Sequence, residues 1–293
     1  MEEIILFSAD DLDDIIKLFA SQEGVKDLVE NYKCFLSVNH SKHIKPFHNR
    51  LQNNPESARA EAVVFSFLVD NHADVQLEED LAKGGVDFRC KINRTEFVVE
   101  VTHLDSESVT HASGLPDEIP KTGSGRHYSM ITPLLRKKAS DKASQMSEYN
   151  CPRILVITSE HPHASTVLDV RAASDLLTSE TKIAISDTPS GELDLITGLE
   201  DSVFFRLKNG ELESCRQSIS AILLFSISGV SAFTVGLLHP DPAYKFSPQL
   251  LSSVPFVGVK EWPPENSRIW SEWQNQETRE LRCHRFWYDE RFR

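Results

Sequence analysis

Two acidic residues occur within a stretch whose other residues are typical of a sheet. The sequence GGVDFRCKINRTEFVVEVTHL, residues 84–104, predicts two strands joined by a turn, with Asp87 in the first and Glu100 in the second. If Asn93 and Arg94 are the central turn residues, the numbers of cross-strand partners sum to 187, and Asp87 lies opposite Glu100. Opposed carboxylates repel each other and lose hydration on burial, so this arrangement requires a proton or a cation between them.

A divalent metal ion is one way to relieve this repulsion, because hard oxygen ligands that converge on one point suit Mg²⁺ or Mn²⁺. A slip of the register by two residues keeps both acids on one face, whereas a slip by one residue separates them. The alternative is that Asp87 ends its strand at an exposed margin while Glu100 faces solvent. The two glycines before Val86 and the apolar neighbours of Glu100 favour a site.

The order of the acids along the chain resembles the PD-(D/E)XK nuclease superfamily. An acid on a predicted helix, Glu61, is followed by Asp87 in GGVDF and Glu100 in VEVT, within roughly residues 55–160. The resemblance implies that Asp87 and Glu100 bind Mg²⁺ or Mn²⁺ together with the backbone carbonyl of Val101. Glu61 would complete the metal's ligand shell directly or through water. Such a metal polarises the scissile phosphate and lowers the pKa of a bound water.

The family's usual lysine, two residues after the glutamate, is Thr102 here, and threonine supplies no cation. Some members of the superfamily supply that lysine from the neighbouring helix, and Lys142-Ala-Ser-Gln145 resembles their Lys-x-x-Gln turn. The spacing i, i+4 and i+7 places Lys138, Lys142 and Gln145 on one face of a predicted helix. The resemblance therefore implies Lys142 as the catalytic cation and Gln145 as the residue that orients substrate or water. Lys83, just before the glycines, is a second candidate cation.

These assignments have structural alternatives. The run RKKASDK, residues 136–142, is also typical of a solvated helix face. Glu61 is equally expected to pair with Arg59 or with a neighbouring lysine. Strand alternation places His103 on the face opposite Glu100, where we expect a packed, hydrogen-bonded histidine. The sequence holds no P-loop, Rossmann, nucleophile-elbow or HExxH zinc motif, so it gives those chemistries no support.

Helices and strands that alternate around this hairpin must position its acids. Asn54 and Pro55 are typical of a helix start, and the helix continues through residue 72 with Glu61 on its apolar face. Residues 75–79 indicate a short strand. Residues 105–126 are rich in Ser, Thr, Gly, Pro and His, which predicts a long mobile loop.

The remaining elements follow the same alternation. The first fifty residues are predicted to be helical, with the basic stretch HSKHIKPFHNR at their end as a connection. A helix is predicted over 127–149, with Pro133 near its start, and a second over 165–177. Strands are predicted over 153–159, 181–186, 202–207, 219–227 and 231–238.

This pattern predicts an α/β fold with a central mixed β-sheet flanked by helices. By the resemblance, that sheet belongs to a restriction-endonuclease-like core. We assign residues 51–240 to the core, residues 1–50 to a helical N-terminal extension and residues 241–293 to an aromatic C-terminal extension. Aromatic and arginine side chains in this last extension are suited to stack bases and hold phosphates, or to dock on the core, a protein partner or a second copy.

Composition limits the cellular setting of the protein. The chain has 293 residues, of which 40% are hydrophobic and 26% charged, an ordinary globular composition. No run of eighteen apolar residues and no basic leader occurs, and the five cysteines are far apart, which predicts a cytoplasmic protein with reduced thiols and no membrane contact. The net charge of −13 excludes a protein that coats nucleic acid through its overall field, so any such contact must be local.

Together with the resemblance, these observations predict a metal-dependent nuclease that hydrolyses phosphodiester bonds in nucleic acid, in DNA more than in RNA. A second reading is a catalytically degenerate nuclease fold that binds nucleic acid or a protein, because Thr102 replaces the motif lysine and the chain is acidic. A third is that the acids are structural and the apolar strand over 219–227 belongs to an interaction scaffold. The face to which Asp87 and Glu100 point distinguishes this third reading from the others.

Overall fold

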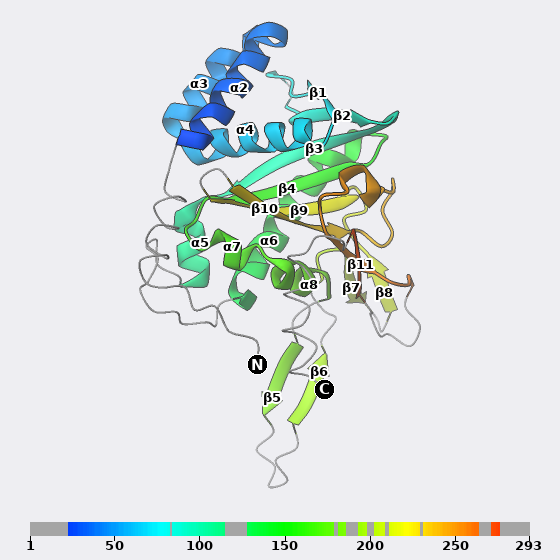
Figure 1. Ribbon diagram of the computed structural model, residues 1–293. Helices are drawn as coiled ribbons and strands as arrows, with labels where there is room; N and C mark the ends of the chain where they lie inside the picture. The colour runs from blue at the N-terminus through cyan, green and yellow to red at the C-terminus, as the bar shows by residue number, and fades with distance from the viewer. Residues whose placement is uncertain are drawn as a thin grey trace, which may run out of the picture.

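The computed structural model describes residues 23–82, 84–114, 128–178, 181–185, 193–197, 202–208, 211–228, 231–263 and 271–275. Its centre is a mixed sheet of eight strands with helices on both faces (Figure 1). The predicted α/β class and the mixed sheet flanked by helices are therefore confirmed. In the described part of the chain, no helix combines the length and the apolar character needed to cross a bilayer.

The sheet joins segments from most of the chain. Its strand order is β1-β2-β3-β4-β9-β10-β11-β12. Neighbours are parallel in the pairs β3/β4, β4/β9 and β10/β11, and antiparallel elsewhere. The strands in this order are Asp74–Leu77, Phe88–Ile92, Thr95–Leu104, Arg153–Ser159, Ala221–Ser228, Ser231–Leu238, Phe256–Val259 and Ser271–Gln274.

The β2/β3 hairpin has the predicted register. Ile92 pairs with Thr95, and the numbers of all five residue pairs sum to 187. Asn93 and Arg94 have φ angles of 48° and 72°, as a two-residue turn between antiparallel strands requires. Strand β2 begins one residue after Asp87, so this acid lies at the entrance to the strand.

Three helices cover one face of the sheet: α2 (Glu23–Asn39), α3 (Ile44–Asn53) and α4 (Pro55–Asp70). The Asn54 side chain accepts a hydrogen bond from the Ser57 N–H at 3.3 Å, which caps α4 as predicted. The expectation that the basic stretch 40–50 is only a connection is wrong. A 3₁₀ turn, Ser41–His43, leads directly into α3 there, because Phe47 anchors this helix in the core.

A second set of helices covers the other face: α5 (Ser106–Ser113), α6 (Tyr128–Ala143), α7 (Ala164–Val167) and α8 (Val170–Thr178). The prediction of a loop from residue 105 is wrong for its first part. The Asp105 side chain caps α5 by accepting the Ser108 N–H at 2.8 Å, and Gly114 ends the helix with a φ of 68°. Residues 115–126, the rest of that predicted loop, lie outside the described residues.

The helix predicted over 127–149 ends earlier than expected. Helix α6 stops at Ala143, and a 3₁₀ turn, Gln145–Glu148, follows it. The helix predicted over 165–177 is divided into α7 and α8. Two small hairpins stand apart from the main sheet: β5 with β6, over Thr181–Ile185 and Leu193–Thr197, and β7 with β8, over Phe205–Lys208 and Glu211–Ser214.

Residues on both sides of the predicted core also belong to this architecture. Strands β11 and β12 continue the sheet at one edge, after a 3₁₀ turn over Pro248–Leu251. Helices α2 and α3 share their apolar cluster with α4 and the sheet. Most of the aromatic tail predicted to bind bases or partners, residues 276–293, lies outside the described residues, so that assignment stays a prediction.

Candidate active site

The structure brings together the side chains of Glu100, Lys142 and Gln145. The Lys142 ammonium donates to Glu100 Oε1 at 2.5 Å and to Gln145 Oε1 at 3.2 Å. The Gln145 amide nitrogen lies 3.2 Å from Glu100 Oε2. Because α6 ends at Ala143, Lys142 stands in its last turn and Gln145 opens the following turn, so both side chains reach the same carboxylate.

A glycine backbone completes this contact. The Gln145 amide also donates to the carbonyl oxygen of Gly85. Gly85 has a φ of 134°, and a Cβ atom there would lie 3.0 Å from the Tyr149 hydroxyl. That hydroxyl accepts the Val86 N–H at 3.1 Å, so the loop before β2 is tied to the end of the α6 region. The two glycines noted in the sequence therefore allow the close approach of backbone to the site.

Asp87 lies beside Glu100 at the start of the hairpin. Its Oδ2 atom accepts the backbone N–H of Val101 at 2.6 Å, across the β2/β3 pair. The sequence resemblance assigns the Val101 carbonyl to a metal, and that assignment stays a prediction. Glu100 is only 3% exposed, and Asp87 is half-buried. The two acids thus meet in a place where neither is fully hydrated.

Glu61 projects from α4 and is bound by partners that the sequence did not indicate. Arg50 donates to both carboxylate oxygens, at 2.8 Å and 3.1 Å, and the Tyr32 hydroxyl donates to Oε1 at 2.7 Å. Pairing of Glu61 with Arg59 is wrong, because Arg59 instead binds Glu160. Glu61 is 5% exposed, so its carboxylate is shielded from water within this ion pair.

A further acid, Glu79, was missed by sequence analysis. Arg50 donates to Glu79 Oε1 at 3.3 Å, which links Glu79 to Glu61 through one guanidinium group. Glu79 Oε2 and His43 Nδ1 lie 3.8 Å apart, and both atoms are buried without a hydrogen-bond partner in the described structure. The structure explains the position of Glu79, because the β1/β2 pairing brings the chain after β1 alongside Asp87.

The surroundings of these acids disfavour their ionised forms. Burial raises the pKa of Glu100 to about 8, with repulsion from Asp87 as the next cause and Lys142 opposing the shift. The pKa of Glu61 is also raised to about 8, first by burial and then by Asp87, while Arg50 opposes the shift. Strongly perturbed carboxyl groups that face each other are typical of functional sites.

Burial and nearby carboxylates also raise the pKa values of Asp87 and Tyr32. Burial raises the pKa of Asp87 to about 6, although the Val101 N–H opposes the shift, and Glu79 adds a smaller upward effect. Burial and the nearby Glu61 carboxylate raise the pKa of the Tyr32 hydroxyl well above its usual value, so it remains a hydrogen-bond donor. Three of the four carboxyl groups form ion pairs with two cations: Arg50 binds Glu61 and Glu79, and Lys142 binds Glu100.

The predicted Mg²⁺ or Mn²⁺ ion fits two of these acids better than the third. Asp87 and Glu100 offer hard oxygen donors whose mutual repulsion a divalent cation would offset. Glu61 would have to release Arg50 before both of its oxygens could serve a metal. Across the described residues, no group of three or more His, Cys, Asp or Glu side chains is gathered as a set of metal ligands. The metal stays a prediction.

Two other candidates lie elsewhere. His103 is packed away from Glu100, as expected, with its ring nitrogens 2.7 Å from Glu56 Oε2 and 3.1 Å from the Thr158 hydroxyl. Lys83, the second candidate cation, lies outside the described residues. The site is therefore defined by Glu100 and the groups that contact it.

No protein-family model matches the chain, and no curated protein or solved structure that was compared with it is similar to it. The chemistry of the site is accordingly inferred from its own residues. A buried carboxylate pair beside a lysine and an amide is suited to bind a cation and to hold an anionic substrate next to it.

Proposed function

We propose that the protein is a metal-dependent nuclease that hydrolyses phosphodiester bonds in nucleic acid, with DNA preferred to RNA. The observation that carries the proposal is the contact of Lys142 with Glu100 at 2.5 Å. Thr102 occupies the usual lysine position, yet a lysine from α6 reaches the same carboxylate, with Gln145 beside it. This is the arrangement that the PD-(D/E)XK resemblance implies for members with a helix-borne lysine.

The order of elements supports the same assignment. Helix α4 is followed by the antiparallel strands β1, β2 and β3, then by the helices α5 and α6, the 3₁₀ turn after them and strand β4, which is parallel to β3. Helix, hairpin, helix and strand stand in this order in the restriction-endonuclease-like core that the resemblance implies. The acids at Glu61, Asp87 and Glu100 come from α4, the entrance to β2 and β3 respectively.

Each side chain has a defined part in this proposal. Asp87 and Glu100 would hold Mg²⁺ or Mn²⁺, which when bound polarises the scissile phosphate and acidifies water at its surface. The Lys142 ammonium stabilises negative charge on the phosphate oxygens. The Gln145 amide offers one donor and one acceptor, so it orients the substrate or the attacking water. Arg50 keeps Glu61 and Glu79 in place by offsetting their charge.

A second candidate is a catalytically degenerate nuclease fold that binds nucleic acid or a protein partner. It is motivated by Thr102 and by the ion pair between Lys142 and Glu100, which occupies one of the carboxylate's oxygens. In such a protein the cation would replace the metal permanently. The same buried charges would then serve only to fix α6 against β3.

Cleavage assays distinguish the two candidates. Plasmid, linear duplex, single-stranded DNA and RNA are incubated with the wild-type protein in Mg²⁺ and in Mn²⁺, beside Asp87→Asn and the surface control Asp141→Asn. A nuclease cuts at least one substrate, loses the cut with Asp87→Asn and retains it with Asp141→Asn, which removes an exposed acid of α6. Equal cutting by all three proteins would contradict the proposed site. Binding without cleavage would favour the degenerate fold.

A further inference from the structure

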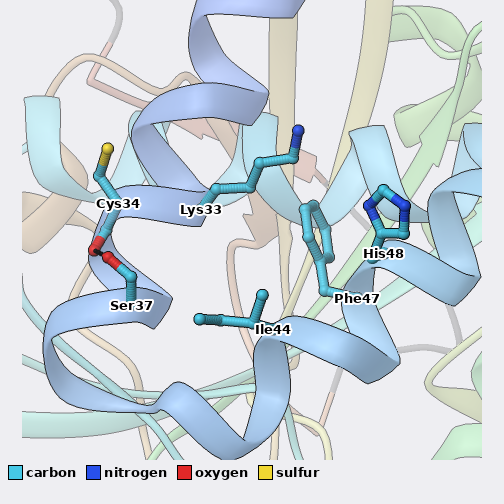
Figure 2. A pocket seen from close by; sticks show the side chains of 6 residues that line it. All are labelled: Lys33, Cys34, Ser37, Ile44, Phe47 and His48. Atoms are coloured by element: carbon cyan, nitrogen blue, oxygen red, sulfur yellow. Dashed lines mark hydrogen bonds between the residues drawn. The ribbon is translucent and has the colours of Figure 1, made fainter.

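A groove lies between helices α2 and α3, away from the candidate active site. Figure 2 shows the side chains that line it, those of α2 on one side and those of α3 on the other. Its volume is about 310 Å³. The lining residues are Lys33, Cys34, Ser37, Ile44, Phe47 and His48.

The groove exposes apolar surface above a buried aromatic floor. Phe47 is 1% exposed and packs edge-on against Tyr32, with ring centroids 5.0 Å apart. Above it, Ile44 is 36% exposed, and Val38, next to the lining residue Ser37, is 79% exposed. Each of these aliphatic side chains would gain free energy if an apolar group covered it.

The α3 side of the groove is basic. Residues 40–50 contain two lysines, one arginine, three histidines and no acid. Arg50 is already bound to Glu61 and Glu79, and Lys33 on the α2 side is paired with Glu30, so the cations of the groove's surroundings without an ion pair among the described residues are Lys42 and Lys45. Both lysines are exposed, and Lys45 is next to Ile44 in α3. The surface is therefore complementary to a ligand that is apolar on one face and acidic at its margins.

The chain contains a segment of this character immediately before α2. Residues 1–22 lie outside the described residues and carry six acids and one lysine. Asp10, Asp13 and Asp14 fall on the polar side of a helical pattern, and Asp11 lies at its margin. Its apolar residues recur at the spacing i, i+3, i+4 and i+7, typical of an amphipathic helix: Leu12, Ile15, Ile16 and Phe19.

The chain before α2 is long enough to reach the groove. From Glu23 to Cys34 the helix rises about 17 Å, at roughly 1.5 Å per residue. The seven residue steps from Ile16 to Glu23 span at most about 23 Å, at roughly 3.3 Å per residue in an extended chain. Leu12, Ile15 and Ile16 are therefore within reach of the groove.

We propose that residues 9–16 bind in this groove of their own chain, with their apolar face on Ile44 and Phe47. The acidic margin faces Lys42 and Lys45. The C-terminal segment 276–293 is a weaker match, because it carries five arginines and four acids and therefore no excess of negative charge. This docking goes beyond the nuclease proposal and does not depend on it.

Cross-linking to Cys34, which is exposed in the groove, tests the proposal. Leu12→Cys and Asp14→Cys are made in the full-length chain and treated with a short bifunctional maleimide, and cross-linked peptides are identified by mass spectrometry. Leu12 lies on the apolar face of the pattern and Asp14 on the opposite face, so the cross-link to Cys34 should form severalfold faster from Leu12→Cys. Adding Cys34→Ser should abolish it.

A second measurement does not require a new cysteine. The rate at which Cys34 is alkylated should increase severalfold in Ile16→Asp, because a buried charge weakens docking, and should remain at the wild-type value in Asp14→Asn. Equal cross-linking from both positions, or equal Cys34 alkylation in all three proteins, would overturn the proposal. A cross-link between chains that increases with protein concentration would also overturn it, since a second copy would then occupy the groove.

Discussion

Helix α4 and strand β3 together build two charged clusters that differ in how their acids are satisfied. In the first, Glu56 of α4 contacts His103 of β3 at 2.7 Å and accepts hydrogen bonds from the hydroxyl and N–H of Ser106. In the second, Glu61 and Glu100 meet Asp87, and burial with mutual repulsion raises both pKa values to about 8. In the first cluster hydrogen bonds satisfy the acid, whereas the second cluster holds more acids than cations.

The pKa of Glu56 shows the contrast directly. Burial alone would raise it, but hydrogen bonds from His103 and Ser106 lower it below its usual value. Lys142 opposes the upward pKa shift of Glu100, and Arg50 opposes that of Glu61, but both pKa values remain above the usual value of glutamate. A network of the first kind stabilises the fold, while a cluster that costs stability is typical of a site kept for function.

The largest expected effect comes from removing the cation of the second cluster. Lys142→Met should reduce metal-dependent cleavage by about 100-fold, because a positioned charged group that assists the transition state contributes on that scale. Initial rates of cleavage at saturating metal measure the change. The matched control is Lys137→Met, which removes an exposed lysine from the same helix. Similar losses in both variants would show that Lys142 acts only through the general charge of α6.

The two clusters should respond oppositely to neutralisation of an acid. Glu56→Gln should lower the free energy of unfolding by about 1–3 kcal/mol, because it weakens bonds to His103 and Ser106. Glu100→Gln should leave that free energy unchanged or raise it, since it removes repulsion with Asp87. Urea denaturation near pH 8 in a chelator measures both. Greater destabilisation by Glu100→Gln than by Glu56→Gln would contradict the contrast between the clusters.

The pH dependence of stability should separate the clusters further. Burial and repulsion from Asp87 raise the pKa of folded Glu61 and Glu100 to about 8, above the value of 4.5 that glutamate has in the unfolded chain. Stability in a chelator should therefore fall as the pH rises between these values, since the folded state binds more protons there. Glu100→Gln should reduce this slope.

Glu56 provides the matched comparison for this slope. Its folded pKa is lowered, so its contribution to stability is present above pH 4.5 and is lost as the pH falls through the folded value. Glu56→Gln should accordingly alter the acid side of the profile and retain the slope above pH 5. A wild-type slope in Glu100→Gln would mean that this acid is already ionised in the folded protein.

The sequence predicted the hairpin more fully than the surroundings of its acids. The two-residue turn at Asn93 and Arg94 determines the register, so local residues were sufficient to align β2 with β3. The spacing of Lys142 and Gln145 also belongs to one short segment, which is why their proximity could be expected. Whether these residues and the acids bind a metal stays a prediction.

The partners of Glu61 could not be predicted in the same way. Arg50 and Tyr32 are 11 and 29 residues away and come from other helices, so no local period relates them to Glu61. The basic stretch around Arg50 lacks a clear apolar period, although Phe47 and Leu51 pack in the core. Helix α5 was missed because its cap, Asp105, was interpreted as part of a polar loop.

The smallest expected effect concerns the cap of α5, the helix whose first residue, Ser106, contacts Glu56. Asp105→Ala should lower the free energy of unfolding by about 1 kcal/mol, because the Ser108 N–H loses its acceptor. Cleavage should be retained, since Asp105 belongs to the fold and not to the proposed site. A large loss of cleavage with little loss of stability would instead connect α5 to the active site.

The central claim is that Asp87 and Glu100 bind a divalent metal, and calorimetric titration of Mg²⁺ and Mn²⁺ tests it most directly. The wild-type protein and the Asp141→Asn control should give a saturable heat of binding, and Asp87→Asn should give none. Folded Asp87→Asn protein that binds metal as tightly as the wild type would contradict the claim. Absence of any binding heat in the wild type would contradict it as well, and would leave the acids as part of a binding module.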